Sequence, residues 1–292
     1  MDADAWDPLV GEDDPFVEHA FLSLLEQSGS VGRGSGWEPT HVTAWRGQRL
    51  VAALPLYLKT HSYGEYIFDW GWADAASRLG IDYYPKLVAM VPVTPVTGRR
   101  FLFAPDEDPA ELVRRLIDGC LEVAESTRAS SIHLLFLSPE EHEWVVRDGR
   151  LMNRLSFQFH WRNHGYETFE DFVGDFRSSM RKKLRKERRV AAEANLRIEE
   201  LRGDELGVAD WRTLEGLYRA TCGRKGSYPY LTPEFFELAP STLDGSPLIF
   251  AAKDEGRIVA ASVNFAKGGH LYGRYWGATQ RHDMLHFELC YY

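Results

Sequence analysis

The sequence has 292 residues, of which 44% are hydrophobic and 26% charged, so it has the composition of a globular protein, not of a disordered or fibrous chain. It contains no apolar run of about 18 residues and starts with an acidic stretch, so we expect no membrane span, no signal peptide and a cytoplasmic location. The net charge of −9 argues against indiscriminate nucleic-acid binding, and three widely spaced cysteines predict neither a metal site nor a disulfide framework.

The first half of the chain reads as a mixed α/β pattern. Apolar residues follow helical spacing over 15–28, and two strands are expected over His41–Trp45 and Arg49–Leu58. A long aromatic loop over 59–98 has only short regular pieces. A helix over 109–128, a buried strand over 131–137, a helix over 139–147 and a strand over 154–161 then complete a sheet flanked by helices.

The second half begins after a boundary expected near 163–168, which predicts two domains, 1–165 and 166–292. Helices are expected over 169–173, 177–194 and 208–221, with a strand over 196–201 and a short helix after Thr232 and Pro233. Three strands follow over 248–253, 257–266 and 270–276, and the last residues, 284–292, open an amphipathic helix. Because such a helix normally leads to another strand, we expect the second sheet to be C-terminally truncated, with a raw edge.

Many short motifs, in order along nearly the whole chain, resemble one bacterial group of the GNAT superfamily, the peptidoglycan biosynthesis/recognition proteins, which are similar to the Fem aminoacyltransferases. The motifs are Phe21–Ser23, Ala53–Lys59, Gly64–Tyr66, Trp70–Asp74, Tyr83–Leu87, Thr94–Gly98, Phe159–Asn163, Leu271–Gly277 and His286–Glu288.

The resemblance implies tandem GNAT-like (acyl-CoA N-acyltransferase-like) domains, α/β (α+β) in class, and transfer of an acyl or aminoacyl group to an amine. It also implies that relatives continue well past the point matching Tyr292. The glycine-rich pyrophosphate turn of acetyl-CoA-using members is missing, since Gly268 and Gly269 lie between strands. Acyl-CoA and aminoacyl-tRNA therefore both stay open as co-substrates, and we expect no tightly bound cofactor and no metal.

The aromatic loop is the first candidate site. Asp69 and Glu65 are candidate bases, and the surrounding residues mix rings with polar groups, as sugar-binding or base-binding sites do. The candidate substrate contacts are Lys59, His61, Trp70, Trp72, Asp74, Tyr83, Tyr84 and Lys86. Lys59 and Lys86 are candidate phosphate contacts within that set. The competing interpretation is that the rings fill a core beneath the loop, although loops of this length are usually functional.

A basic helix is the second candidate. Residues 177–189 hold eight Lys and Arg side chains against the single acid Glu187, and Arg181, Arg185, Arg188 and Arg189 are expected on its outer faces. Such a surface suits the phosphates of a tRNA or of an anionic precursor. A solvated helix face explains the same pattern.

Two further groups complete the candidates. His160, a candidate catalytic residue, stands with Trp161, Arg162 and Asn163 at the end of an expected strand near the domain junction, where these residues could instead cap a linker. On the expected strand 270–276, Tyr272, Arg274 and Trp276 share one face, with Glu288 as the expected partner of Arg274 in a substrate-side or structural ion pair.

Two functions fit these patterns. The first is a transferase acting on an amine acceptor, such as a peptidoglycan precursor, in a cleft between the domains. The second is a noncatalytic protein that recognises a cell-wall precursor or another anionic glycan. A transferase needs two substrates to approach one base, whereas a recognition protein needs only one groove with stacked aromatics.

Overall fold

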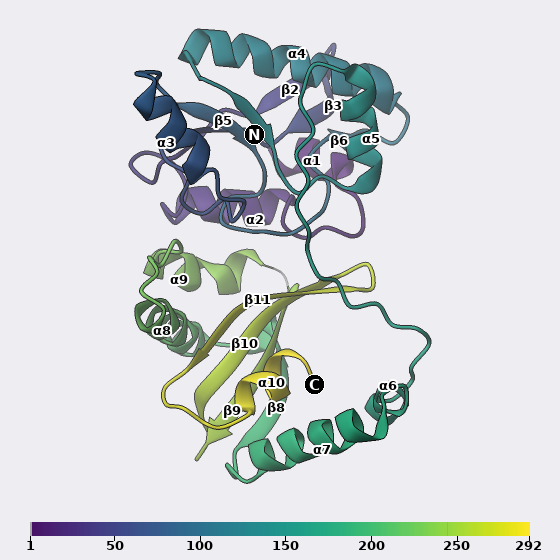
Figure 1. Cartoon of the computed structure of the whole chain (residues 1–292), viewed down its shortest axis with the longest axis vertical. Helices are drawn as coiled ribbons and strands as arrows, with labels where there is room; N and C mark the ends of the chain where they lie inside the picture. Colours follow the sequence, from purple (N-terminus) through teal and green to yellow (C-terminus); the bar gives the residue numbers. More distant parts are fainter. Residues whose placement is uncertain (1, 244) are drawn as a thin grey trace. The chain divides into compact units, whose positions relative to one another are not determined.

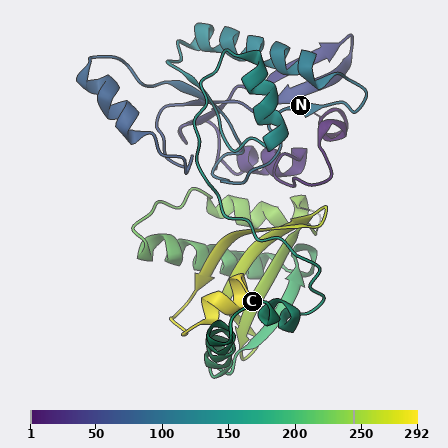
Figure 2. The same cartoon turned by 45° about the vertical axis from the view of Figure 1, so that its right-hand side comes forward.

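The computed structural model describes residues 2–243 and 245–292, which form two compact units (Figures 1 and 2). Unit 1 contains residues 2–155, 230–243 and 267–270, and unit 2 contains residues 156–229, 245–266 and 271–292. The units are therefore discontinuous in sequence, which differs from the single cut near residue 165 expected from the sequence.

Unit 1 contains two small sheets with helices around them. One sheet has the strand order β1-β4-β5-β7 and the other β2-β3-β6. The strands are β1 (Trp37–Pro39), β2 (Val42–Arg46), β3 (Arg49–Leu54), β4 (Tyr57–Lys59), β5 (Lys86–Ala89), β6 (Leu102–Phe103) and β7 (Ile132–Leu134). The helices are α1 (Ala3–Trp6), a 3-10 turn (Asp7–Leu9), α2 (His19–Gln27), α3 (Trp70–Arg78), α4 (Pro109–Thr127), α5 (Pro139–Asp148) and α9 (Pro233–Thr242).

Pro55 explains why the single expected strand over 49–58 is two strands in different sheets. Proline cannot donate a ladder hydrogen bond, so the chain leaves β3 at Leu54 and resumes as β4 at Tyr57. β4 then pairs antiparallel with β5, and β5 pairs parallel with β7. This change of sheet places β4 beside β5, which is the pairing that builds the candidate site.

The core of unit 1 lies between these sheets and α4, which runs along the top of the unit in Figure 1. α4 begins at Asp108, whose side chain accepts a hydrogen bond from the Ala110 N–H, with Pro109 in the first turn. Its inner face buries Leu112, Val113, Leu116, Ile117 and Cys120. Each fully buried aliphatic side chain contributes roughly 1.5–3 kcal/mol, so this stripe anchors the face of the sheet that carries Leu87 and Ala89.

Unit 2 is built on a four-stranded antiparallel sheet with the order β11-β10-β9-β8. Its strands are β8 (Arg197–Arg202), β9 (Pro247–Asp254), β10 (Arg257–Lys267) and β11 (His270–Ala278). Its helices are α6 (Phe169–Gly174), α7 (Ser178–Ala192), α8 (Val208–Arg224) and α10 (Leu285–Cys290), with a 3-10 turn at Gly203–Glu205. The ring of Tyr275 packs on Tyr218 of α8, whereas that of Trp276 packs on His286 of α10, so the two helices cover opposite faces of the sheet.

The strand expected over 154–161 is wrong. Residues 152–163 carry no strand pairing, and the apolar members of the alternating pattern, Leu155, Phe157, Phe159 and Trp161, are exposed by 64% to 91%. Alternation predicts a half-buried strand, but a strand forms only where a neighbouring strand offers hydrogen-bond partners. Within the described residues no such neighbour meets this segment.

The sequence analysis predicted an irregular loop where the structure has α3. Gly71 and the surrounding aromatics disfavour a helix, although Ala73–Arg78 favours one. The Thr232 cap is confirmed, since its hydroxyl accepts a hydrogen bond from the Phe235 N–H at 3.3 Å with Pro233 in the first turn. Over the ranges that the structure describes, none of the helices combines the length and apolar character needed to cross a bilayer.

Candidate functional site

The candidate site in unit 1 starts from two lysines that face each other across neighbouring strands. In the antiparallel pairing of β4 with β5, Lys59 is the direct partner of Lys86, so both side chains leave the same face of the sheet. Both are 0% exposed. Two like charges directly opposite each other in a dry environment destabilise a sheet, so acidic partners are required nearby.

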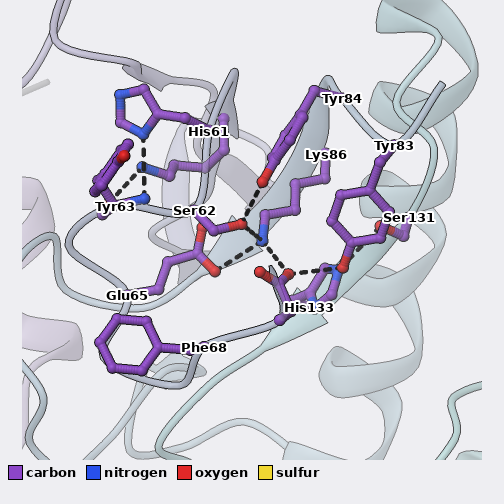
Figure 3. Close-up of polar contacts among 12 residues, drawn as sticks. His61, Ser62, Tyr63, Glu65, Phe68, Tyr83, Tyr84, Lys86, Ser131 and His133 are labelled. Carbon is purple, nitrogen blue, oxygen red and sulfur yellow. Dashed lines mark hydrogen bonds and ion pairs between the residues drawn. The ribbon is translucent and has the colours of Figure 1, made fainter. Parts of the chain in front are cut away.

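The segment between the two strands provides those partners. Glu65 and Asp69 are 1% and 2% exposed. The Lys86 Nζ donates hydrogen bonds to Glu65 Oε2 at 2.8 Å, to Asp69 Oδ2 and to Ser62 Oγ at 2.8 Å (Figure 3). The loop therefore folds back over the sheet and pairs both carboxylates with Lys86, and we call Lys59, Lys86, Glu65 and Asp69 the buried ion cluster.

Hydroxyl groups surround the buried ion cluster. The Tyr83 hydroxyl donates to Asp69 Oδ2 at 2.6 Å, and the Ser62 hydroxyl lies 2.8 Å from that of Tyr84. His133, which shares a sheet face with Lys86 through the parallel pairing of β7 with β5, has its ring 6.5 Å from that of Tyr83. Figure 3 shows these side chains converging on the Lys86 amine from both sides.

Among the described residues, Lys59 makes no ion pair with the carboxylates of the buried ion cluster. Its Nζ donates to the Tyr63 carbonyl at 3.0 Å and stands 3.5 Å from the centre of the Trp37 ring. Burial lowers the pKa of Lys59 to about 7, against the opposing attraction of Glu65. Lys59 is thus a lysine that changes charge near neutral pH.

The two carboxyl groups differ in their ionisation. Burial raises the pKa of Glu65, although the attraction of Lys86 opposes the shift. Burial acts on Asp69 in the same direction, but hydrogen bonds from Lys86, Ser62 and Tyr83 outweigh it and lower the pKa of Asp69. Asp69 is therefore a weak base, and Glu65 has the more basic carboxylate of the two.

Five aromatic side chains of the segment that carries Glu65 and Asp69 are exposed, and we call them the aromatic rim. Their exposed fractions are 55% for Tyr63, 43% for Tyr66, 58% for Phe68, 41% for Trp70 and 63% for Trp72. The rings of Tyr63 and Trp70 lie 5.0 Å apart, and Phe68 stacks on Trp70 at 6.3 Å. The alternative that these rings fill a core does not describe the rim, because rings in a core are shielded from solvent.

Two other predicted contacts lie at the edges of this region. His61 is half-buried, accepts a hydrogen bond from the Tyr63 N–H at 3.3 Å, and has its pKa lowered by burial. A side chain at Gly36 would come within 2.1 Å of the His61 ring, so glycine is required there. Asp74 is exposed on α3 and pairs with Arg78 at 2.6 Å, one helical turn away.

The group 160–163 lies outside the buried ion cluster. His160 and Arg162 are exposed, and the His160 ring lies 3.0 Å from Gln158. Asn163 shapes a turn, since its Oδ1 accepts from the Gly165 N–H at 3.0 Å and the Tyr166 N–H at 2.7 Å. Trp161 lies beside Tyr166 at 6.4 Å. The linker-capping interpretation therefore describes Asn163.

On β11 the faces are as the alternation predicts, but the expected ion pair is wrong. Trp276 packs against His286, with ring centres 5.0 Å apart. Glu288 pairs with Arg188 of α7 at 2.7 Å, and its carboxylate accepts hydrogen bonds from both the Nε and the Nη2 of that arginine. The guanidinium of Arg274 lies 5.0 Å from the ring of its neighbour Tyr275, and Tyr272 is half-buried.

Most of the arginines predicted to bind phosphate on the basic helix α7 are hydrogen-bonded or ion-paired to residues of unit 2. Arg181 donates to the Phe176 carbonyl at 2.9 Å, Arg185 pairs with Glu170 at 2.7 Å, and Arg188 pairs with Glu288. The exposed cations on α7 that make no hydrogen bond or ion pair within the described chain are Lys182, Lys186 and Arg189, spaced four and three residues apart on one helix face. We call these three the unpaired stripe.

Sequence reasoning missed Ser62 and His133 at the buried ion cluster, and Lys182 and Lys186 on α7. No single-residue signal marks Ser62 or His133, because strand pairing places them. Helical spacing places Lys182, Lys186 and Arg189 on one face, but the pairing of the neighbouring arginines with Glu170 and Glu288 depends on how the helices pack. Among residues 2–243 and 245–292, no group of three or more His, Cys, Asp or Glu side chains is arranged to hold a metal.

Comparison with known proteins gives the fold and the family. The solved structure titled "Crystal structure of FemX" has a TM-score of 0.50 and 11% identity, over 96% of this chain and 80% of that one. At this identity the likeness shows the fold alone, and it confirms the predicted mixed α/β architecture of sheets flanked by helices. No curated protein matches the chain. The model of the FemAB-like family, described as peptidoglycan biosynthesis/recognition, matches residues 1–292, and the chain therefore belongs to this family.

Proposed function

We propose that this chain is a transferase that joins an acyl or aminoacyl group to an amine of a peptidoglycan-type glycopeptide. Membership of the FemAB-like family supports a role in peptidoglycan biosynthesis, and the Fem proteins that it resembles are aminoacyltransferases. The observation that carries the proposal is the buried ion cluster beneath an exposed aromatic rim, both within unit 1. Sugar rings stack on exposed aromatics, and attack by an acceptor amine needs a base that takes its proton.

The chemistry requires an unprotonated acceptor amine, held against an activated carbonyl. Glu65, with its raised pKa, is the better candidate base of the two carboxylates, and Lys59 is a second group that titrates near neutral pH. The donor is an acyl-CoA or an aminoacyl-tRNA. The unpaired stripe of α7 supports a phosphate-rich donor, because its cations are not spent on internal ion pairs.

Noncatalytic recognition of a cell-wall precursor is the second candidate function. It is favoured by Asp69, whose pKa is lowered and whose Oδ2 already accepts hydrogen bonds from Lys86 and Tyr83. A carboxylate that is held in this way orients a ligand better than it accepts a proton.

One assay separates the two functions. The purified protein is mixed with a muramyl pentapeptide that has a free side-chain amine, together with either an acyl-CoA mixture or charged tRNA. We expect mass spectrometry to detect an amide product with one donor and none with the Nε-acetylated peptide. Binding of the peptide without product from either donor would establish recognition instead. Absence of both binding and product would contradict both functions.

A further inference from the structure

Two buried carboxylate oxygens of the buried ion cluster lack a hydrogen-bond partner. Glu65 Oε1 and Asp69 Oδ1 are both shielded from solvent, and no donor in the described chain reaches either of them. A buried acceptor without a donor is costly, and it is more costly on an ionised group. These two oxygens can therefore each accept a hydrogen bond that no donor of the described chain provides.

None of the neighbouring donors makes a hydrogen bond to these two oxygens. An ammonium group has three N–H donors, and Lys86 directs them to Ser62, Glu65 Oε2 and Asp69 Oδ2. The Tyr83 hydroxyl donates to Asp69 Oδ2 as well, and not to Oδ1. Lys59 donates to the Tyr63 carbonyl and forms no ion pair with either carboxylate among the described residues.

The balance of charge indicates what kind of donor is missing. Two carboxyl groups face one hydrogen-bonded cation, Lys86, so with both ionised the group carries an excess negative charge unless Lys59 stays protonated. Burial, which raises the pKa of Glu65, makes that excess charge costly. Burial works against protonation of Lys59, as its lowered pKa shows. The other nearby groups that titrate are Tyr83 and His133. Burial raises the pKa of Tyr83 and lowers that of His133 to about 4, so both are neutral near pH 7.

We propose that Glu65 Oε1 and Asp69 Oδ1 bind a primary ammonium group of a ligand, which supplies the missing donors and the missing positive charge. The inference rests on the proposed function and deepens it, since it assigns the acceptor amine to a defined pair of atoms. An ammonium suits the pair better than a neutral amide or hydroxyl group, because only a cation offsets the excess charge.

Because these atoms are shielded from solvent, a ligand reaches them only when the segment around them opens. α3, which begins directly after Asp69, has no buried side chain, and in Figure 2 it stands away from the rest of unit 1. Displacing an element that buries little apolar surface costs little hydrophobic free energy. The aromatic rim flanks the same segment, so a ligand can stack on the rim while its ammonium passes beneath.

The test uses Nα-acetyl-lysine methylamide as a probe and its Nε-acetylated analogue as the uncharged control. Binding is followed by tryptophan fluorescence, since Trp70 adjoins Asp69. We expect the free amine to bind at least about tenfold more tightly than the analogue, because the amide of the analogue cannot make the charge-assisted hydrogen bonds of an ammonium. If the wild-type protein binds the two probes with equal affinity, the proposal is overturned, and no variant is needed for this test.

Variants locate the site. Glu65→Gln and Asp69→Asn keep side-chain shape and should each weaken the free amine at least about tenfold, whereas Glu122→Gln, an exposed change on α4, should leave affinity unchanged. Unchanged affinity in both cluster variants would overturn the assignment. The probe lacks sugar and donor, so failure of the transfer assay leaves this test intact. If the protein shows transfer activity and Glu65→Gln leaves the KM for the acceptor unchanged, the inference is contradicted but the proposed transferase function is not.

Discussion

Replacing Lys86 by methionine tests whether the buried ion cluster holds unit 1 together. Methionine fills a similar volume but leaves Glu65 and Asp69 without the cation that hydrogen-bonds both of them. Removing one partner of a buried ion pair costs about 3–5 kcal/mol, because an uncompensated charge stays in the interior. For a domain of this size, 1 kcal/mol lowers Tm by about 2–4 °C, so we expect a loss of roughly 6–20 °C.

The pH dependence of that loss follows from the carboxyl groups. In the wild type the pKa of Asp69 lies below its ordinary value of 3.8, so its contribution is present above that value and is lost only in stronger acid. Without Lys86, burial dominates and raises the folded-state pKa of both carboxyl groups. The variant then gains stability as the pH falls through these raised values. The difference between wild type and variant should be largest near about pH 8 and should shrink toward about pH 5.

The measurement is urea unfolding at both pH values, followed by tryptophan fluorescence and circular dichroism. Lys182→Met, which removes an exposed cation of the unpaired stripe, serves as the matched control and should change the free energy of unfolding by less than about 0.5 kcal/mol. Adding Glu65→Gln and Asp69→Asn to the Lys86 variant should recover part of the loss. A loss below about 1 kcal/mol, or an equal loss at both pH values, would refute the reasoning.

Three further outcomes are expected. Burial lowers the pKa of Lys59 from 10.5 to about 7, so between these pH values the unfolded chain binds more protons than the folded one. The free energy of unfolding of the wild type should therefore rise with pH in this range, by at most about 1.4 kcal/mol per pH unit. In urea unfolding at several pH values, Lys59→Met should remove most of this rise. Trp72→Ala should change Tm little yet weaken glycopeptide binding in a fluorescence titration. Trp37→Ala, which removes a buried ring, should lower the free energy of unfolding by about 3–5 kcal/mol. An equal loss of stability in the two variants would contradict a binding role for the rim. Changing the unpaired stripe to glutamine should lower the salt slope of RNA binding by about 2, with Arg185→Gln as the control, and an unchanged slope in filter binding would exclude RNA contact there.

Local patterns in the sequence were sufficient for the elements that local physics controls. The helix over 109–127 follows from apolar spacing with Asp108 and Pro109 at its start, and α9 follows from Thr232 and Pro233. The aromatic loop was predicted to be a substrate site, which stays a prediction; five of its rings are exposed, and so do not fill a core. The same patterns failed over 154–161, where alternation predicts a strand but ladder partners are needed to form one.

Only the tertiary structure decided how the candidate site is assembled. Lys59 and Lys86 are separated by 26 intervening residues, and nothing local requires them to be strand partners. Register between strands depends on turn geometry and on which face is buried, and both are set by the whole sheet. The same holds for Glu288, which takes Arg188 and not Arg274 because helix packing brings α10 to α7. The sequence by itself determined which chemical groups the chain carries and where its helices begin, whereas long-range pairing determined which of those groups meet.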